Sequence, residues 1–313
     1  MIMNKDIIFL TPVCTHNIWG GTRLNREFGY PIEGDDIGEC WGISAHPNGD
    51  GTVASGAYKG MKLSELWEKH PELFGDTGMD RFPLLVKIID AKDDLSIQVH
   101  PDDAYAKAHE NGSLGKTECW FILDCKENAT LVVGHNAKTK EELEQMIHEG
   151  RWKEFIREIP IKPGDFIQID PGTVHAIKGG TLLLETQQSS DITYRVYDYD
   201  RLSNGKPRQL HIVQSIDVIT VPAKSADNSV VHIEKKDDAI QQLIQCPYYT
   251  VYRIDVEHRV ETWQDKPFVL MSVVEGEGTL NGTPLKKGDH LILPDGYGKV
   301  ELQGRMQIIA STI

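Results

Sequence analysis

One short pattern occurs twice in the chain and limits the folds that are open to it. In residues 162–175, a Pro-Gly turn, a run with alternating apolar residues and a second Pro-Gly turn lead to His175. Residues 286–299 repeat this arrangement in degraded form, with Lys299 at the position of His175. Short strands separated by Gly and Pro turns are typical of double-sheet barrels of the jelly-roll type, and the repeat indicates two of them. The sequence therefore predicts a mainly β protein with two jelly-roll barrels.

The organisation of the chain follows from its length and from one linker. A length of 313 residues allows about two domains. Residues 206–227, with two prolines and a polar run at 224–229, form the expected boundary. We expect an N-terminal metal-binding domain over residues 1–222 and a degenerate C-terminal domain over 223–313 that lacks metal ligands. Short helical insertions are predicted in the first domain, at about residues 62–75, 101–111 and 139–159, the last opened by the capping box of Thr139 and Glu142.

Composition excludes several classes of function. The formal net charge of −14 and the lack of a Lys- or Arg-rich run argue against a nucleic-acid partner. No apolar run approaches the ~18 residues that a membrane span needs, and no secretory leader is visible. The five cysteines are scattered without a CxxC pair, which is typical of free thiols in a reducing cytoplasm. We expect a cytoplasmic protein, a monomer or weak homodimer, that binds a small molecule.

The stretch from Leu95 to His100 is the most informative single strand. Side chains alternate along a strand, so Ser96, Gln98 and His100 share one face and the apolar residues share the other. A buried polar group needs a partner, so a strand that turns Gln and His inward implies something to bind there. The alternative is a half-exposed edge strand whose polar face meets water. Alternation alone does not choose between these two interpretations.

Three residues on separate predicted strands form a plausible metal-ligand set: His100, Glu118 and His175. Two imidazoles and one carboxylate are a common set for a catalytic divalent metal, zinc above all, which keeps one position open. Gln98 is a fourth candidate; coordination is favoured, although its amide could instead orient a substrate. The competing interpretation is that each is an isolated, hydrogen-bonded core residue. The set as a whole, with the turn that precedes His175, favours a metal.

Three cations accompany this set: Lys87, Lys116 and Arg195. Positive groups that converge on a metal site in an acidic protein indicate an anionic substrate. Asp191 and Asp198 flank Arg195 and are possible ion partners, and this role is preferred for Asp198. Other histidines are expected at the surface, among them His46, His109, His135 and His148; His290 faces the wrong way to be a ligand and is expected to be a surface or core residue.

Taken together, six motifs resemble those of type I mannose-6-phosphate isomerases, in particular the short bacterial form. They cover nearly the whole chain in order: Ile18-Trp-Gly-Gly, Gly38-Glu-Cys-Trp-Gly-Ile-Ser-Ala-His46, Leu95-Ser-Ile-Gln-Val-His-Pro-Asp, Gly115-Lys-Thr-Glu-Cys-Trp, Pro171-Gly-Thr-Val-His-Ala and Ser190-Asp-Ile-Thr-Tyr-Arg-Val-Tyr-Asp198. The family is a zinc-dependent cupin that interconverts mannose 6-phosphate and fructose 6-phosphate. The short form lacks a large helical insert of longer members, so substrate contacts from that insert do not carry over.

The resemblance implies a role for each candidate residue. It implies one zinc ion per chain with Gln98, His100, Glu118 and His175 as ligands, and Arg195 as the catalytic arginine. Active-site residues of the family stand at the positions of Lys87, Lys116 and Asp191.

Aldose–ketose isomerisation moves a proton between C1 and C2 through an enediol, which requires a base and stabilisation of negative charge. Arg195 suits charge stabilisation. The base stays open between Asp191, a metal-bound water and a lysine of lowered pKa.

Two other classes of function compete with the isomerase. The same three ligands form the iron site of non-haem oxygenases; this interpretation predicts bound iron and oxygen consumption, and leaves the three cations without a purpose. A non-catalytic sugar-phosphate-binding protein would keep the metal and the cations but show no turnover. The isomerase is the function that we expect.

Overall fold

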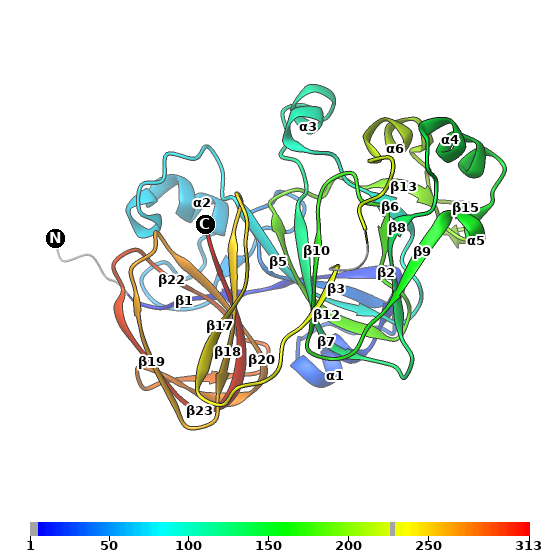
Figure 1. Cartoon of the computed structure of the whole chain (residues 1–313). Coiled ribbons are helices and arrows are strands. Elements are labelled where there is room, and N and C mark those ends of the chain that lie inside the picture. Colours follow the sequence, from blue (N-terminus) through cyan, green and yellow to red (C-terminus); the bar gives the residue numbers. More distant parts are fainter. Residues whose placement is uncertain (1–5, 226–228) are drawn as a thin grey trace.

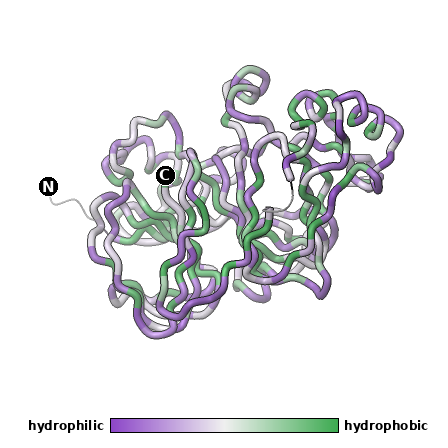
Figure 2. The backbone as a smooth tube through the Cα atoms, viewed as in Figure 1, coloured by the Kyte–Doolittle hydropathy of each residue, from purple (hydrophilic) through white to green (hydrophobic). Residues whose placement is uncertain are grey.

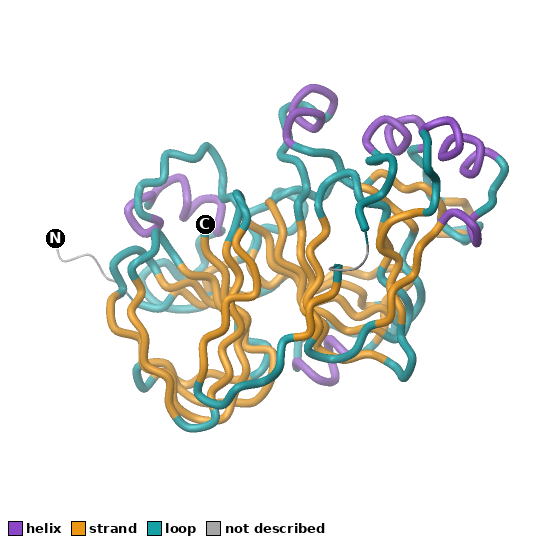
Figure 3. The backbone as a smooth tube through the Cα atoms, in the orientation of Figure 1, coloured by secondary structure: helices purple, strands orange, loops and turns teal. Residues whose placement is uncertain are grey.

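Strands dominate the computed structural model, which describes residues 6–225 and 229–313 (Figure 1). The mainly β prediction is confirmed. Most of the helices lie at the periphery of the sheets (Figure 3). The helices of the described residues are α1 (Arg23–Phe28), α2 (Leu63–Lys69), the 3-10 helix η1 (Pro71–Phe74), α3 (Asp103–His109), α4 (Lys140–His148), α5 (Trp152–Phe155) and α6 (Ile212–Val218). None of the helices in the described ranges is long and apolar enough to cross a membrane.

Two sheets in the N-terminal part face each other. The seven-stranded sheet has the order β16 (Val230–His232), β10 (Asp165–Ile169), β7 (Glu118–Cys125), β12 (Thr181–Gln188), β5 (Leu84–Ala91), β2 (Val13–Gly21), β3 (Ile37–Ile43). The five-stranded sheet has the order β13 (Tyr194–Tyr197), β6 (Ile97–Val99), β11 (His175–Ala176), β8 (Thr130–His135), β9 (Ile156–Pro160). A short hairpin of β14 (Leu202–Ser203) and β15 (Lys206–Pro207) stands apart.

A hydrophobic core fills the space between these two sheets. Trp120 and Ile122 of β7 pack there with Leu183 of β12 and with Leu131 and Val133 of β8. On the outer face of the five-stranded sheet, helices α4, α5 and α6 pack over a second apolar layer. Figure 2 shows hydrophobic residues concentrated along the strands and hydrophilic residues along many of the loops. Both faces of the five-stranded sheet are therefore covered, and β6 and β11, which lie next to or carry two of the predicted ligands, are interior strands of this sheet.

The C-terminal part is one nine-stranded sheet. Its order is β17 (Ala239–Gln245), β18 (Thr250–Val256), β23 (Gly298–Thr312), β20 (Val269–Leu280), β22 (His290–Leu293), β1 (Ile8–Thr11), β4 (Thr52–Val53), with β19 (Arg259–Gln264) on β23 and β21 (Thr283–Lys286) on β20. It encloses its own apolar cluster, which includes Val273, Leu291 and Leu302. The more detailed prediction of two jelly-roll barrels stays a prediction.

Strands cross the expected domain boundary in both directions. β1, from the start of the chain, pairs with β22 of the C-terminal sheet. β16, which follows residue 222, pairs with β10 of the seven-stranded sheet. The two-domain division at residue 222 stays a prediction. In the structure, each part of the chain contributes a strand to a sheet of the other part. Residues 226–228 of the polar run lie outside the described residues.

The helical insertions are found with three differences from the prediction, of which one is helix α1, outside the three expected regions. Helices α2 and η1, α3, and the pair α4 and α5 lie in the three expected regions, but the last helix ends at Phe155, and residues 156–159 belong to β9. The reason is that Ile156 and Ile159 pair with β8, which overrides the helical pattern. Helix α6 lies inside the expected linker, where its apolar residues pack against the five-stranded sheet.

Candidate metal centre

The three predicted ligands meet at one buried point. His100 directly follows β6, Glu118 opens β7 and His175 opens β11. The Nε2 atoms of His100 and His175 lie 3.1 Å apart. Each is 3.3 Å from a different oxygen of the Glu118 carboxylate. These side chains come from both facing sheets and are almost fully buried. The two sheets therefore bring together residues that lie up to 75 positions apart in the chain.

The electrostatics of the site favour neutral imidazoles beside an ionised carboxylate. Burial, assisted by the Lys116 charge, lowers the pKa of His100 to about 3. Burial also lowers the pKa of His175. Burial alone would raise the pKa of Glu118, but the Lys116 ammonium and the neighbouring imidazoles hold it well below its usual range. Metal ligands must be neutral His and ionised carboxylate, so the site has the required protonation near neutral pH.

The donor set fits a divalent metal. His175 uses Nδ1 for a 2.8 Å hydrogen bond to the Thr173 carbonyl, which fixes the ring and leaves Nε2 free to coordinate. Both Glu118 oxygens are buried without a hydrogen-bond donor other than the charged partners already named, and such orphaned acceptors need compensation. A cation between two imidazole nitrogens and a carboxylate would supply it. The geometry thus supports a metal cofactor, with the nature of the ion open between zinc and its first-row neighbours.

Gln98 lies beside this set. Its Cα is paired with that of His175 across β6 and β11, and its amide nitrogen is 3.3 Å from His175 Nε2. A half-turn of the amide group would present its oxygen, the better metal donor, at the same place. Gln98 is therefore close enough to complete the coordination or to contact a substrate, and its assignment as a ligand stays a prediction.

Lys116 and Lys87 belong to one buried network of charges. The Lys116 ammonium lies 2.8 Å from Glu118 and 3.1 Å from His100 Nε2. Lys87, on β5, lies 3.7 Å from Glu185 and 3.5 Å from Glu39. Burial alone would lower the pKa of Lys116, but the carboxylates of Glu118 and Glu185 raise it. Lys87, which lies in the apolar run of β5, is thus buried beside two carboxylates rather than directed to solvent.

Arg195 reaches the site through a serine. Its backbone is paired with Gln98 across β13 and β6, and its Nε donates a 3.3 Å hydrogen bond to Ser96 Oγ. Nη1 donates to the Gln209 carbonyl at 2.9 Å. Within the described residues Nη2 makes no hydrogen bond or ion pair, so one donor face of the guanidinium is available to a ligand. The preferred pairing of Arg195 with Asp198 is wrong, because Asp198 forms its ion pairs with two other arginines, Arg201 and Arg208.

Asp191 lies at the far end of the same network. Its carboxylate accepts a hydrogen bond from the Asn48 amide and lies 3.4 Å from His46 Nε2. The His46 ring packs edge-on against Trp41, whose own ring lies 4.7 Å from the Lys87 ammonium. The expectation of a surface position is therefore wrong for His46. It is also wrong for His135, which is buried on Phe155, whereas His109 and His148 are exposed.

Sequence reasoning missed the acidic and aromatic partners of Lys87. Glu185 is buried opposite Lys87 in the register of β12 and β5, and it accepts a 3.0 Å hydrogen bond from Trp120 Nε1. Burial, reinforced by the Glu118 charge, raises the pKa of Glu185. The signal was present, since Glu185 follows three leucines in a strand and is as unusual there as Lys87 is in β5.

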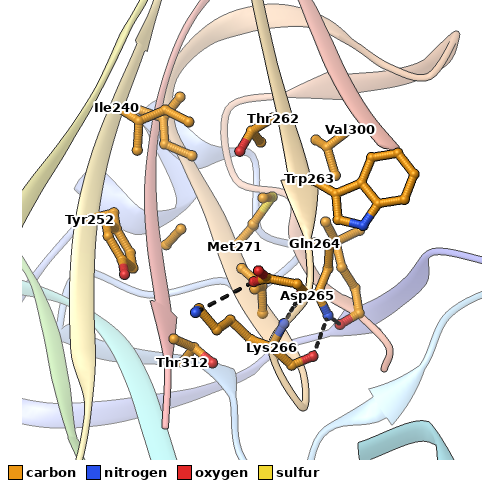
Figure 4. A pocket seen from close by; sticks show the side chains of 14 residues that line it. Ile240, Tyr252, Thr262, Trp263, Gln264, Asp265, Lys266, Met271, Val300 and Thr312 are labelled. Carbon is orange, nitrogen blue, oxygen red and sulfur yellow. Dashed lines mark hydrogen bonds and ion pairs between the residues drawn. The ribbon is translucent and has the colours of Figure 1, made fainter. Parts of the chain in front are cut away.

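A separate cavity in the C-terminal sheet does not compete as a site for this chemistry. It has a volume of about 240 Å³ and is lined mostly by apolar side chains such as Tyr252 and Met271 (Figure 4). Its buried amide, that of Gln264, is already bonded to the backbone of Lys266 and Pro294. No group of three or more potential metal ligands other than His100, Glu118 and His175 occurs among the described residues.

Comparisons with known proteins indicate one family. Residues 7–123 match the family model for the catalytic domain of type I phosphomannose isomerase, and residues 239–313 match that for the cupin domain of mannose-6-phosphate isomerase. The chain is 51% identical to mannose-6-phosphate isomerase ManA of Bacillus subtilis, with 99% of each chain covered. It is 48% identical to mannose-6-phosphate isomerase of Streptococcus mutans, with 97% of each covered. A crystal structure of the mannose 6-phosphate isomerase from Bacillus subtilis superimposes with a TM-score of 0.91, at 50% identity and with 98% and 99% of the two chains covered.

The mainly β fold and the buried His–Glu–His set define a cupin-type protein with a site suited to a metal ion. The extent and degree of identity then fix the family. The chain belongs to the type I mannose-6-phosphate isomerases.

Proposed function

We propose that this protein is a zinc-dependent aldose–ketose isomerase that interconverts mannose 6-phosphate and fructose 6-phosphate through an enediol. The observation that carries the proposal is the convergence of His100, Glu118 and His175 on one buried point, with the Lys116 ammonium in contact with two of them. Neither an oxygenase nor a purely structural metal site explains why buried cations surround the ligands. A negatively charged substrate that develops further negative charge during the reaction does.

In this proposal His100, Glu118 and His175 hold one zinc ion, and Gln98 completes the set. Bound zinc would act as a Lewis acid that polarises the sugar carbonyl and makes the neighbouring C–H more acidic. The neutral imidazoles and the ionised carboxylate allow the ion to bind without the release of several protons.

The remaining residues bind the sugar and stabilise charge. Lys116 is kept protonated by its raised pKa, which makes it a donor to an enediolate oxygen rather than a base. Arg195, with its free Nη2 face, stabilises negative charge on the substrate. Lys87 and Asp191 contact the substrate further out. Asp191 is the carboxylate among the candidates for the base that moves the proton between C1 and C2. Its side chain is 35% exposed and is therefore accessible to a substrate.

The cellular context follows from the same proposal. A phosphosugar substrate and five free cysteines suit the cytoplasm. We further propose a monomer or weak homodimer that does not bind nucleic acid or membranes. Light scattering of the purified protein at low and high concentration measures the oligomeric state directly.

The test is isomerisation of mannose 6-phosphate by purified full-length protein, measured before chelation, after chelation and after zinc is added back. We expect turnover that disappears with the chelator and returns with zinc. Iron that restores oxygen consumption in place of isomerisation would favour the oxygenase. Metal-loaded protein that binds the phosphosugar without turnover would favour a binding protein.

A further inference from the structure

Two cysteines lie directly opposite each other on β2 and β3, and β3 in turn pairs with β5, the strand that carries Lys87. Cys14 of β2 and Cys40 of β3 are paired in the antiparallel register. Directly opposed residues in such a pair have Cα atoms about 4.5–5.5 Å apart, which is within the range of disulfide-bonded cysteines. Both side chains point to the same face of the sheet and pack in one hydrophobic core cluster, Cys40 within it and Cys14 against it. All five cysteines of the chain are described, and all are free.

The two thiols differ in the way that stepwise oxidation requires. Cys14 is partly exposed, and the neighbouring Cys40 thiol lowers the pKa of the Cys14 thiol. Cys40 is fully buried, and burial raises the pKa of its thiol well above the usual value. The thiolate is the form that attacks an oxidant, so Cys14 is the sulfur that reacts first. Cys40 is protected from solvent but adjacent, which is the position of a resolving cysteine.

Strand β3 connects this pair to the metal centre. Cys40 lies between Glu39 and Trp41, whose side chains point to the opposite face of the strand. Glu39 accepts a 2.8 Å hydrogen bond from Trp41 Nε1, and both contact the Lys87 ammonium. A covalent bond between Cys14 and Cys40 would draw β3 toward β2 at Cys40, the residue between Glu39 and Trp41. A change in the position of Cys40 is therefore transmitted to the environment of Lys87.

We propose that Cys14 and Cys40 form a reversible oxidation site, in which hydrogen peroxide produces a cross-strand disulfide that lowers turnover at the metal centre. In the first step the Cys14 thiol loses its proton and the thiolate attacks one peroxide oxygen; the O–O bond breaks, the sulfur becomes a sulfenic acid, and the leaving hydroxide takes up that proton and departs as water. In the second step the Cys40 sulfur attacks Cys14, the S–O bond breaks and a second water leaves. Peroxide is reduced and the two thiols are oxidised; a dithiol reductant reverses the change. The effect on turnover rests on the proposed isomerase function, whereas the disulfide does not.

The experiment treats full-length, zinc-loaded protein with hydrogen peroxide, removes the peroxide with catalase and measures two properties. Peptide mass analysis without reduction is expected to find residues 14 and 40 linked, with two of the five thiols lost and recovered after dithiothreitol. The kcat/KM for mannose 6-phosphate is expected to fall by roughly tenfold and to recover on reduction, since small displacements near a reacting centre are costly.

Three variants make the result specific. Cys14→Ser is expected to abolish both the link and the loss of activity under peroxide, and Cys40→Ala is expected to abolish the link. Cys125→Ser, which removes a partly exposed cysteine without a paired thiol, is expected to behave like the wild type. A link between other cysteines, or over-oxidation of Cys14 without a link, would overturn the proposed site. A clean link with unchanged kcat/KM would overturn its control of turnover, and absence of any isomerisation before oxidation would count against the proposed function alone.

Discussion

At the scale of single residues, burial sets the charge of several groups, and His290 illustrates this outside the metal centre. It was expected to be a surface or core histidine, and it lies in the core, where Nδ1 is 2.8 Å from Ser272 Oγ and Nε2 is 2.7 Å from the Tyr30 hydroxyl. Burial lowers the pKa of His290 to about 3. The folded protein therefore keeps this ring neutral at pH values where the unfolded chain protonates it.

This pKa shift makes stability depend on pH. Because the unfolded state binds more protons between pH 6.5 and 3, the contribution of His290 is fully present above pH 6.5 and is lost as the pH falls. At pH 5 the loss is about 2 kcal/mol. His290→Gln removes this titration, so the drop in the free energy of unfolding from pH 7 to pH 5 should be smaller than in the wild type. Denaturant melts at both pH values measure it; an equal drop in both proteins would contradict the prediction.

Arg195 offers the sharpest separation between catalysis and metal binding. Arg195→Ala removes the guanidinium but leaves Gln98 and the three proposed ligands in place, so the metal content should stay normal. We expect kcat to fall by about 10²–10³-fold, as for the loss of one charge-stabilising donor. Arg305→Ala, at an exposed arginine of β23, serves as a control with normal activity. Normal turnover in Arg195→Ala would remove this residue from the mechanism.

How well the site could be predicted differs from residue to residue. The convergence of His100, Glu118 and His175 followed from alternation along strands and from the turn before His175. The partner of Arg195 could not be predicted, because nearness in sequence placed Asp198 beside it while the backbone directs Asp198 toward Arg201 and Arg208. Arg195 and Arg201 are both three residues from Asp198, so spacing in the sequence does not choose between them. The turn after β13 and the hairpin of β14 and β15 bring Arg201 and Arg208 to this carboxylate.

At the scale of elements, local signals worked where the contacts are local. The predicted N-cap at Thr139 is present: Thr139 Oγ1 accepts a 3.2 Å hydrogen bond from the Glu142 backbone N–H, and helix α4 begins at Lys140. The reciprocal bond of the predicted capping box differs, because the Glu142 carboxylate accepts from the Lys138 backbone N–H, at 2.7 Å. Sequence reasoning failed for β9 and α6, whose states are decided by packing against β8 and the rest of the five-stranded sheet. The two segments have apolar residues at similar spacings, but Ile156–Pro160 forms strand β9 and Ile212–Val218 forms helix α6.

The cap gives an element-scale prediction with no effect on the site. Thr139→Ala removes the acceptor for the first turn of α4 and should lower the free energy of unfolding by about 1 kcal/mol. Thr139→Ser keeps the hydroxyl and should stay near the wild type. Isomerase activity should be unchanged in both, because α4 covers the outer face of the five-stranded sheet. Chemical denaturation measures the difference; equal stability of the Ala and Ser variants would show that the cap contributes little.

At the scale of the whole molecule, one hydrophobic core joins the two parts of the chain. It contains Leu63, Phe74 and Phe82 from the N-terminal part and Phe268 and Ile292 from the C-terminal part. β1 and β16 add hydrogen bonds across the same division. The composition of residues 206–227 predicts a linker between two separable domains. The shared core and the exchanged strands instead couple the two parts of the chain. We therefore expect the protein to unfold in a single cooperative step.

Phe268 tests this coupling. Its ring is fully buried and lies 5.7 Å from that of Phe74 and 5.6 Å from that of Phe82, so Phe268→Ala should cost about 3–5 kcal/mol. Leu302→Ala, in the apolar cluster inside the C-terminal sheet, should shift the same transition although it is outside the shared core. Tryptophan fluorescence and circular dichroism should give coincident melts for all three proteins. Two separate unfolding transitions, of which Leu302→Ala shifts only one, would contradict this prediction. They would mean that the C-terminal sheet unfolds on its own, although it contains β1 from the start of the chain.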